Sequence, residues 1–331
     1  MSDPRPVLDD LRAESDELDR LVSGLSAPQW AAATPAPGWT VAHQIAHLAW
    51  TDRAALLAAT DPDGFAAEVE KAATAPDSYV DDAAEAGAVL VSAELVARWR
   101  AGREELQRVL REAPADARFP WYGPPLSVAG VATGRLMETW AHGQDVADAL
   151  GVARTPTERL RHVVRMGVGA RDFSYALRGL RPPAEQFRVE LTGPSGEVWA
   201  HGPEDAAQRV TGSALDFCLL ATQRAHRADV DVHAEGPDAE QWLGIAQAFA
   251  GPPGAGRPPA PGPAADGEPA PGPAPAPGPV PVPVPGMVAG ADDAADAGRV
   301  PETGRASEAG PVPDGGGAPR RGRATGRGPA R

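Results

Sequence analysis

Several residue types and sequence features are scarce in this chain, and each scarcity excludes a class of protein. Cys218 is the only cysteine among the 331 residues, so no disulfide can form within the chain, which fits a reducing compartment. The formal net charge of −14 argues against a general nucleic-acid binder, because neutralising phosphates requires clustered lysine and arginine. A Gly-rich phosphate loop between a strand and a helix is also missing.

Long apolar runs are missing as well. No stretch approaches the roughly 18 continuous apolar residues of a membrane span. The N-terminal sequence MSDPRPVLDDLRAE is acidic and lacks the apolar region of a secretory signal. We therefore expect a cytoplasmic protein that binds neither membrane nor nucleic acid.

Proline is unevenly distributed and predicts where the folded part ends. Residues 251–331 hold 20 of the 37 prolines and little aliphatic pattern, so this segment cannot bury a core. At roughly 150 residues per domain, the remainder suggests two small domains. We predict a first domain over 5–152, a second over 153–250 and a disordered Pro/Ala/Gly-rich tail over 251–331.

The first of these domains has helical periodicity in four long segments. They lie at about 6–23, 40–59, 83–112 and 127–150. Thr40 and Ser127 are suitable N-caps, and Gly151 is a suitable stop. With one long connection over 60–82, this pattern predicts an antiparallel four-helix bundle.

The pattern changes after residue 152. A helix is predicted over 155–176, and alternating residues predict strands at 187–191, 197–201 and 230–234. Further helices are predicted at 216–222 and 238–249. We therefore expect a small α+β domain after the bundle.

The placement of histidine is the main chemical signal. His43 and His47 are four residues apart in the second predicted helix, and Glu138 and His142 are four apart in the fourth, so each pair shares one helix face. A Glu/His pair on one helix and a histidine from its neighbour supply three ligands for a catalytic divalent metal, with the fourth position open. The alternative is that Glu138 is exposed and His142 is a hydrogen-bonded core residue.

Other side chains near these pairs have open roles. His43 could be a fourth ligand, a base that contacts a ligand but not the metal, or a surface residue. Asp145, one turn after His142, could orient that imidazole or form a surface ion pair. Trp121 and Tyr122 could border the metal pocket, and Cys218 lies in an apolar run typical of a structural thiol.

Two motifs resemble a known family. GWTV at 38–41 leading into IAHL at 45–48, together with METWAHGQDVA at 137–147, is similar to the mycothiol-dependent maleylpyruvate isomerase family of DinB-like metal-binding proteins. The resemblance continues through VTGSALD at 210–216 to Leu220 and Arg224, and covers about 250 residues. It implies a DinB-like bundle with a zinc-type site formed by His47, Glu138 and His142.

The same resemblance implies a cosubstrate and a reaction class. It implies mycothiol as a low-molecular-weight thiol, and Arg224 as a residue that holds substrates, with His226 and Arg227 as nearby alternatives. Zinc deprotonates a coordinated thiol, which can then attack a small electrophile. We expect an isomerase or an S-transferase. The alternatives are a metal-dependent hydrolase at the same site and a non-enzymatic metal- or ligand-binding module.

Overall fold

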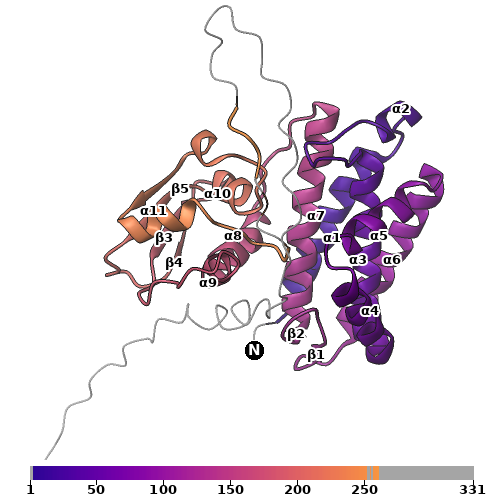
Figure 1. The fold of residues 1–331 in the computed structure, drawn as a ribbon, viewed down its shortest axis with the longest axis horizontal. Helices are drawn as coiled ribbons and strands as arrows, with labels where there is room; N and C mark the ends of the chain where they lie inside the picture. The colour runs from indigo at the N-terminus through magenta and orange to yellow at the C-terminus, as the bar shows by residue number, and fades with distance from the viewer. Residues whose placement is uncertain (1–2, 252–253, 255, 261–331) are drawn as a thin grey trace, which may run out of the picture. The chain divides into compact units, whose positions relative to one another are not determined.

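Helices dominate the first 151 residues of the computed structural model, which describes residues 3–251, 254 and 256–260 (Figure 1). The elements are α1 (Arg5–Val22), α2 (Ala27–Trp30), α3 (Val41–Thr60), α4 (Pro62–Thr74), α5 (Tyr79–Ala88), α6 (Ser92–Glu112), β1 (Arg118–Phe119), β2 (Leu126–Ser127) and α7 (Val128–Leu150). Among the long helices, α3 packs against α5, α6 and α7, and α1 packs against α6 and α7. The site described below lies where α3 meets α7.

The two helices that carry the site have well-defined ends. The Thr40 side chain and His43 form a capping box at the start of α3. The Ser127 hydroxyl accepts from the Gly130 N–H at the start of α7, and Gly151 ends this helix in the left-handed conformation with φ 66°. These ends fix the register of both helices and hence which side chains face each other.

The segment between α3 and α6 differs from the prediction. Residues 60–82 are not a simple connection, because Asp61 caps α4 by accepting from the Gly64 N–H, with Pro62 at the first position of the helix. The single helix predicted over 83–112 is two helices, since Val91 is extended and separates α5 from α6. Val89 and Val91 are 71% and 72% exposed, so no packing holds this stretch in one helix.

The second part of the chain is a small α+β unit. Its elements are α8 (Leu160–Gly169), α9 (Arg171–Ala176), β3 (Arg188–Thr192), β4 (Val198–His201), β5 (Arg209–Ser213), α10 (Ala214–Ala221), the 3-10 helix η1 (Arg227–Asp229), β6 (Val232–Glu235) and α11 (Pro237–Leu243). The sheet order is β4-β3-β5-β6; β3 is parallel to β5 and antiparallel to β4, and β5 is antiparallel to β6. The predicted fold class, a helical bundle followed by a small α+β unit, is confirmed.

Details of this unit correct the sequence prediction. The helix expected over 155–176 is two shorter helices, and the one expected over 238–249 ends at Leu243. The strand β5 was not predicted, because Gly212 interrupts its apolar pattern. This glycine has φ 146°, and a Cβ there would lie 2.2 Å from the carbonyl oxygen of Asp231, so the close pairing of β5 with β6 requires glycine.

The core runs across the predicted domain boundary. One cluster of buried residues includes Leu8 and Leu136 of the bundle as well as Phe217 and Trp242 of the α+β unit. The division at residue 152 therefore stays a prediction. The predicted tail falls mostly outside the described residues, but within its described beginning Arg257 binds two carboxylates of α7.

Candidate metal centre

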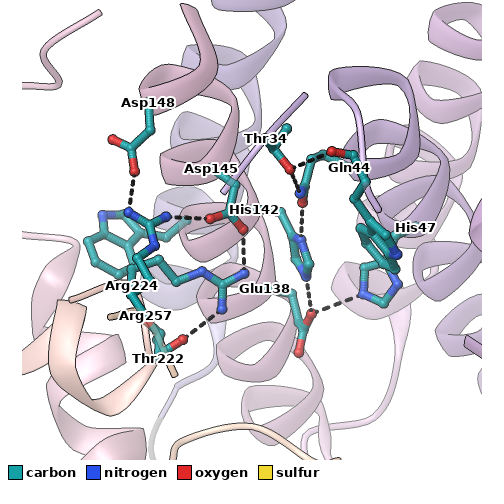
Figure 2. A network of polar contacts seen from close by, with 12 residues as sticks. Thr34, Gln44, His47, Glu138, His142, Asp145, Asp148, Thr222, Arg224 and Arg257 are labelled. Atoms are coloured by element: carbon teal, nitrogen blue, oxygen red, sulfur yellow. Dashed lines mark hydrogen bonds and ion pairs between the residues drawn. The ribbon is translucent and has the colours of Figure 1, made fainter. Parts of the chain in front are cut away.

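Three predicted ligands meet between α3 and α7. His47 comes from α3, and Glu138 and His142 come from α7; their ligand atoms all lie within 4.8 Å of one another. The Nε2 atoms of both histidines approach the same oxygen, Oε2 of Glu138, at 3.2 Å from His47 and 3.1 Å from His142 (Figure 2). The i, i+4 spacing on α7 and the packing of α3 on α7 thus bring together the residues that the sequence singled out.

A chain of hydrogen bonds behind His142 fixes which ring nitrogen carries its proton. The Thr34 hydroxyl donates to the carbonyl oxygen of Trp39 at 2.9 Å, so its oxygen must accept from Nε2 of Gln44, also at 2.9 Å. This turns Oε1 of Gln44 toward Nδ1 of His142 at 2.5 Å. The proton of His142 therefore lies on Nδ1, and the lone pair of Nε2 faces Glu138.

The ionisation states of His47, Glu138 and His142, called the cluster below, suit metal binding. Burial, together with the neighbouring His47, lowers the pKa of His142 to about 4, so its imidazole is neutral at pH 7. Burial alone would raise the pKa of Glu138, whereas the contact of its Oε2 with Nε2 of His47, 3.2 Å away, lowers it. A carboxylate and the lone pair of an imidazole thus face each other 3.1 Å apart.

The chemistry of these facing acceptor atoms is suited to a divalent cation between them. Two acceptors pointing at each other without a proton between them repel, whereas both are ligands that zinc prefers. Nδ1 of His47 is buried and has no hydrogen-bond partner among the described residues, so the contact with Glu138 is made by its other ring nitrogen alone. The donor set of His47, Glu138 and His142 fits a metal ion.

Tryptophan rings enclose the cluster. The ring of Trp39 lies 5.3 Å from that of His47 and 5.9 Å from that of His142, and Trp50 lies 5.7 Å from His47. Large apolar rings exclude water and lower the local dielectric, which strengthens electrostatic interactions within the site. Trp121 and Tyr122 line the same cavity as His47 and Glu138, which is the role that the sequence left open for them.

Asp145 does not orient His142, which corrects one of the roles considered for it. Its Oδ2 accepts from Nη2 of Arg224 and its Oδ1 from Nη2 of Arg257, both at 2.7 Å (Figure 2). Gln44 makes the contact with His142 instead. Arg224 also donates to the carbonyl of Thr222 at 2.7 Å, and its buried Nε has no hydrogen-bond partner among the described residues.

The remaining candidates lie outside the cluster. Nδ1 of His43 contacts the Thr40 hydroxyl at 2.8 Å and its Nε2 contacts Glu85 at 2.8 Å, so it is not a fourth ligand. His226 caps η1, and Arg227 pairs with Glu240. Burial raises the pKa of the Cys218 thiol well above its usual value, as expected for a structural cysteine.

Residues 11–147, which hold all three cluster residues, match the family described as the mycothiol maleylpyruvate isomerase N-terminal domain, and residues 183–235 match a family described as wyosine base formation. Two uncharacterized proteins from two strains of Mycobacterium tuberculosis are each 58% identical over 257 residues, which cover 78% of this chain and 100% of each relative.

Residues 11–147 of the chain thus belong to the mycothiol maleylpyruvate isomerase N-terminal domain family. Among solved structures, a mycothiol-dependent maleylpyruvate isomerase is 18% identical with a TM-score of 0.49, and a histidine-to-alanine mutant of a mycothiol-dependent maleylpyruvate isomerase is 17% identical with a TM-score of 0.48. Each comparison covers 72% of this chain and 96% of the other.

Sequence reasoning missed two contributors to the site of this family member. Gln44 lies three residues before His47, a spacing that places both on one face of α3, and this could have marked it as a partner. The second is Arg135, a buried cation three residues before Glu138 on α7.

None of the described helices is long and apolar enough to cross a membrane.

Proposed function

We propose that this protein holds a divalent metal ion, zinc by its donor set, on His47, Glu138 and His142, and uses it to activate a low-molecular-weight thiol. The supporting observation is the pair of facing acceptors on Glu138 and His142, whose repulsion a cation would relieve. Membership of a mycothiol-dependent family makes mycothiol the candidate thiol.

Zinc bound here would lower the pKa of a coordinating thiol, so that the sulfur is a nucleophilic thiolate at neutral pH. The protein's own residues supply position and exclusion of water. Gln44 keeps Nε2 of His142 unprotonated and directed toward Glu138. Trp39 and Trp50 pack against the imidazole of His47 and cover part of the cluster.

Arg224 is proposed to hold a carboxylate or other acceptor of the thiol or of the electrophile. Of its five N–H donors, one on Nη1 binds Thr222 and one on Nη2 binds Asp145, while Nε has no hydrogen-bond partner among the described residues. Asp145 holds the guanidinium of Arg224 in place. Asp145 also binds Arg257, which remains its partner when Arg224 is removed. The substitution Arg224→Ala therefore tests the binding role without leaving a buried carboxylate unpaired.

The proposed reaction begins with addition of the thiol sulfur to a carbon–carbon double bond conjugated to a carbonyl. The new bond is carbon–sulfur, and the π-electron pair moves toward the carbonyl. If the former double bond rotates and the thiol leaves, the product is an isomer and the thiol is regenerated. If the carbon next to the carbonyl instead takes up a proton from solvent, replacing the one that the thiol lost, the thiol adduct is the product of an S-transferase.

The test is an assay of zinc-loaded protein with mycothiol and a panel of electrophiles, following both thiol consumption and isomer composition. We expect turnover only with thiol present, and roughly a 10- to 100-fold loss of kcat/KM in Arg224→Ala at unchanged metal content. Arg227→Ala, which removes an arginine paired with Glu240, is the control and should match wild type. Thiol-independent turnover would instead indicate a hydrolase, and no turnover with any thiol would contradict the proposal.

A further inference from the structure

A cavity of about 260 Å³ adjoins the cluster, and the chemistry of its walls indicates what it binds. His47 and Glu138 line one part of it, while His142 and Arg224 are not among its lining residues. The remaining wall is mainly aromatic and aliphatic, and its rings are supplied by Trp50, Tyr79, Trp121, Tyr122 and Phe173.

The hydroxyl groups of Tyr79, Tyr122 and Thr51 in these walls have hydrogen-bond partners within the protein. The Tyr79 hydroxyl donates to Glu68 at 3.1 Å and lies 3.1 Å from the Tyr122 hydroxyl. The Thr51 hydroxyl, also at the cavity, donates to the carbonyl of His47 at 2.9 Å. These residues therefore present mostly carbon to a ligand, and a highly charged molecule would lose its hydration there without compensation.

Arg135 is the exception in this wall. Its side chain is 2% exposed, and its Nε donates to Asp52 at 2.9 Å, so the pair is neutral as a whole. Nη2 of Arg135 is buried and has no hydrogen-bond partner among the described residues. A buried donor without a partner favours a ligand that brings an acceptor atom.

We propose that this cavity binds an α,β-unsaturated carbonyl compound with an apolar, ring-sized body, and that Arg135 donates to its carbonyl oxygen. Arg135 and Glu138 both line the cavity and lie about one turn apart on one face of α7, so a ligand that contacts Arg135 would lie beside the cluster. A small dicarboxylate fits this wall poorly. The inference rests on the proposed function in taking the cluster as the reaction centre.

Two glycines on helices give a matched pair of variants. Gly134 lines the cavity, and a Cβ at this position would have no other atom within 4 Å. Gly102 on α6 also has open space around such a Cβ but does not line the cavity. Leucine at either position should preserve the helix, whereas only Gly134→Leu would fill the cavity.

The experiment is calorimetric titration of zinc-loaded protein, without thiol, with 4-phenylbut-3-en-2-one and with fumarate. We expect the phenyl enone to bind at least tenfold more tightly than fumarate. Gly134→Leu should weaken enone binding at least tenfold, and Gly102→Leu should leave it unchanged. Equal or tighter binding of fumarate, or unaltered enone binding in Gly134→Leu, would overturn the inference.

The same variants separate this inference from the proposed function. His47→Ala should lose metal and thiol-dependent turnover yet still bind the enone, because the aromatic walls remain. If wild type binds no metal but the enone still binds and Gly134→Leu abolishes this binding, the proposed function fails and the cavity assignment stands. If thiol-dependent turnover is found but enone binding is absent, the cavity assignment is wrong.

Discussion

At the scale of single residues, the most important feature of the proposed metal site is which ring nitrogen of His142 carries the proton. Its position follows from a hydrogen-bond chain that begins at the carbonyl of Trp39 and passes through Thr34 and Gln44. The ligand nitrogen is thereby held unprotonated by a residue that does not itself contact the metal position. Partners of this kind commonly change metal affinity by 10- to 100-fold when removed.

Gln44→Leu should therefore lower metal affinity by roughly 10- to 100-fold while the protein stays folded. Leucine fills a similar volume but cannot accept from Nδ1 of His142, so the imidazole loses its fixed tautomer. The measurement is a competition titration with a chromogenic chelator. Gln144→Leu, on α7 with its amide bound to Asp148 rather than to the cluster, is the control. Equal affinities in wild type and Gln44→Leu would contradict the assignment.

At the scale of elements, α3 is held in place by close contact with α5. A Cβ at Gly87 of α5 would lie 2.7 Å from the Cβ of Ala46, the residue next to His47. The glycine therefore allows an approach between these helices that a larger residue would prevent. The sequence predicted this part of α5 only as the start of one long helix over 83–112, so its role as a separate helix packed against α3 was not foreseen.

The substitution Gly87→Ala should destabilise the protein by about 1–3 kcal/mol through overpacking against α3. Gly102→Ala, in the open part of α6, should stabilise it by about 0.5–1 kcal/mol, since alanine is the better helix former. Urea denaturation of both variants measures the difference. A Gly87→Ala variant as stable as wild type or more stable would show that the contact between α5 and α3 is unimportant.

The sequence predicted those parts of the fold and site that depend on local pattern. Periodicity located the long helices, and the spacing of Glu138 and His142 placed them on one face. It did not predict β5, because a strand containing Gly212 depends on its neighbours in the sheet. Nor did it predict that Asp145 binds Arg224 and Arg257, because both arginines are far from it in sequence. Only tertiary packing decides whether Asp145 contacts these arginines or the neutral His142.

At the scale of the whole molecule, buried histidines couple stability to pH. Burial lowers the pKa of His162, and burial with Arg165 and Arg188 lowers that of His201. The unfolded chain, with histidine pKa values of about 6.5, takes up protons before the folded protein does. The free energy of unfolding should therefore decrease as pH falls below about 6.5, by at most about 1.4 kcal/mol per pH unit for each histidine.

Urea denaturation between pH 7.5 and 5.5 measures this dependence. The double variant His162→Gln, His201→Gln should show a shallower slope than wild type over that interval. His233, which is exposed and pairs with Asp231, provides the control through His233→Gln. Identical slopes in wild type and the double variant would show that these two histidines do not control the acid sensitivity.

The central claim, that three side chains from α3 and α7 bind one divalent cation, is tested most directly by metal analysis of the purified full-length protein by mass spectrometry. Wild type and His43→Ala should each contain about one equivalent of metal, because His43 contacts Thr40 and Glu85 and not the cluster. His47→Ala should remain folded and lose the metal. Equal metal content in wild type and His47→Ala, or a larger loss in His43→Ala, would contradict the account.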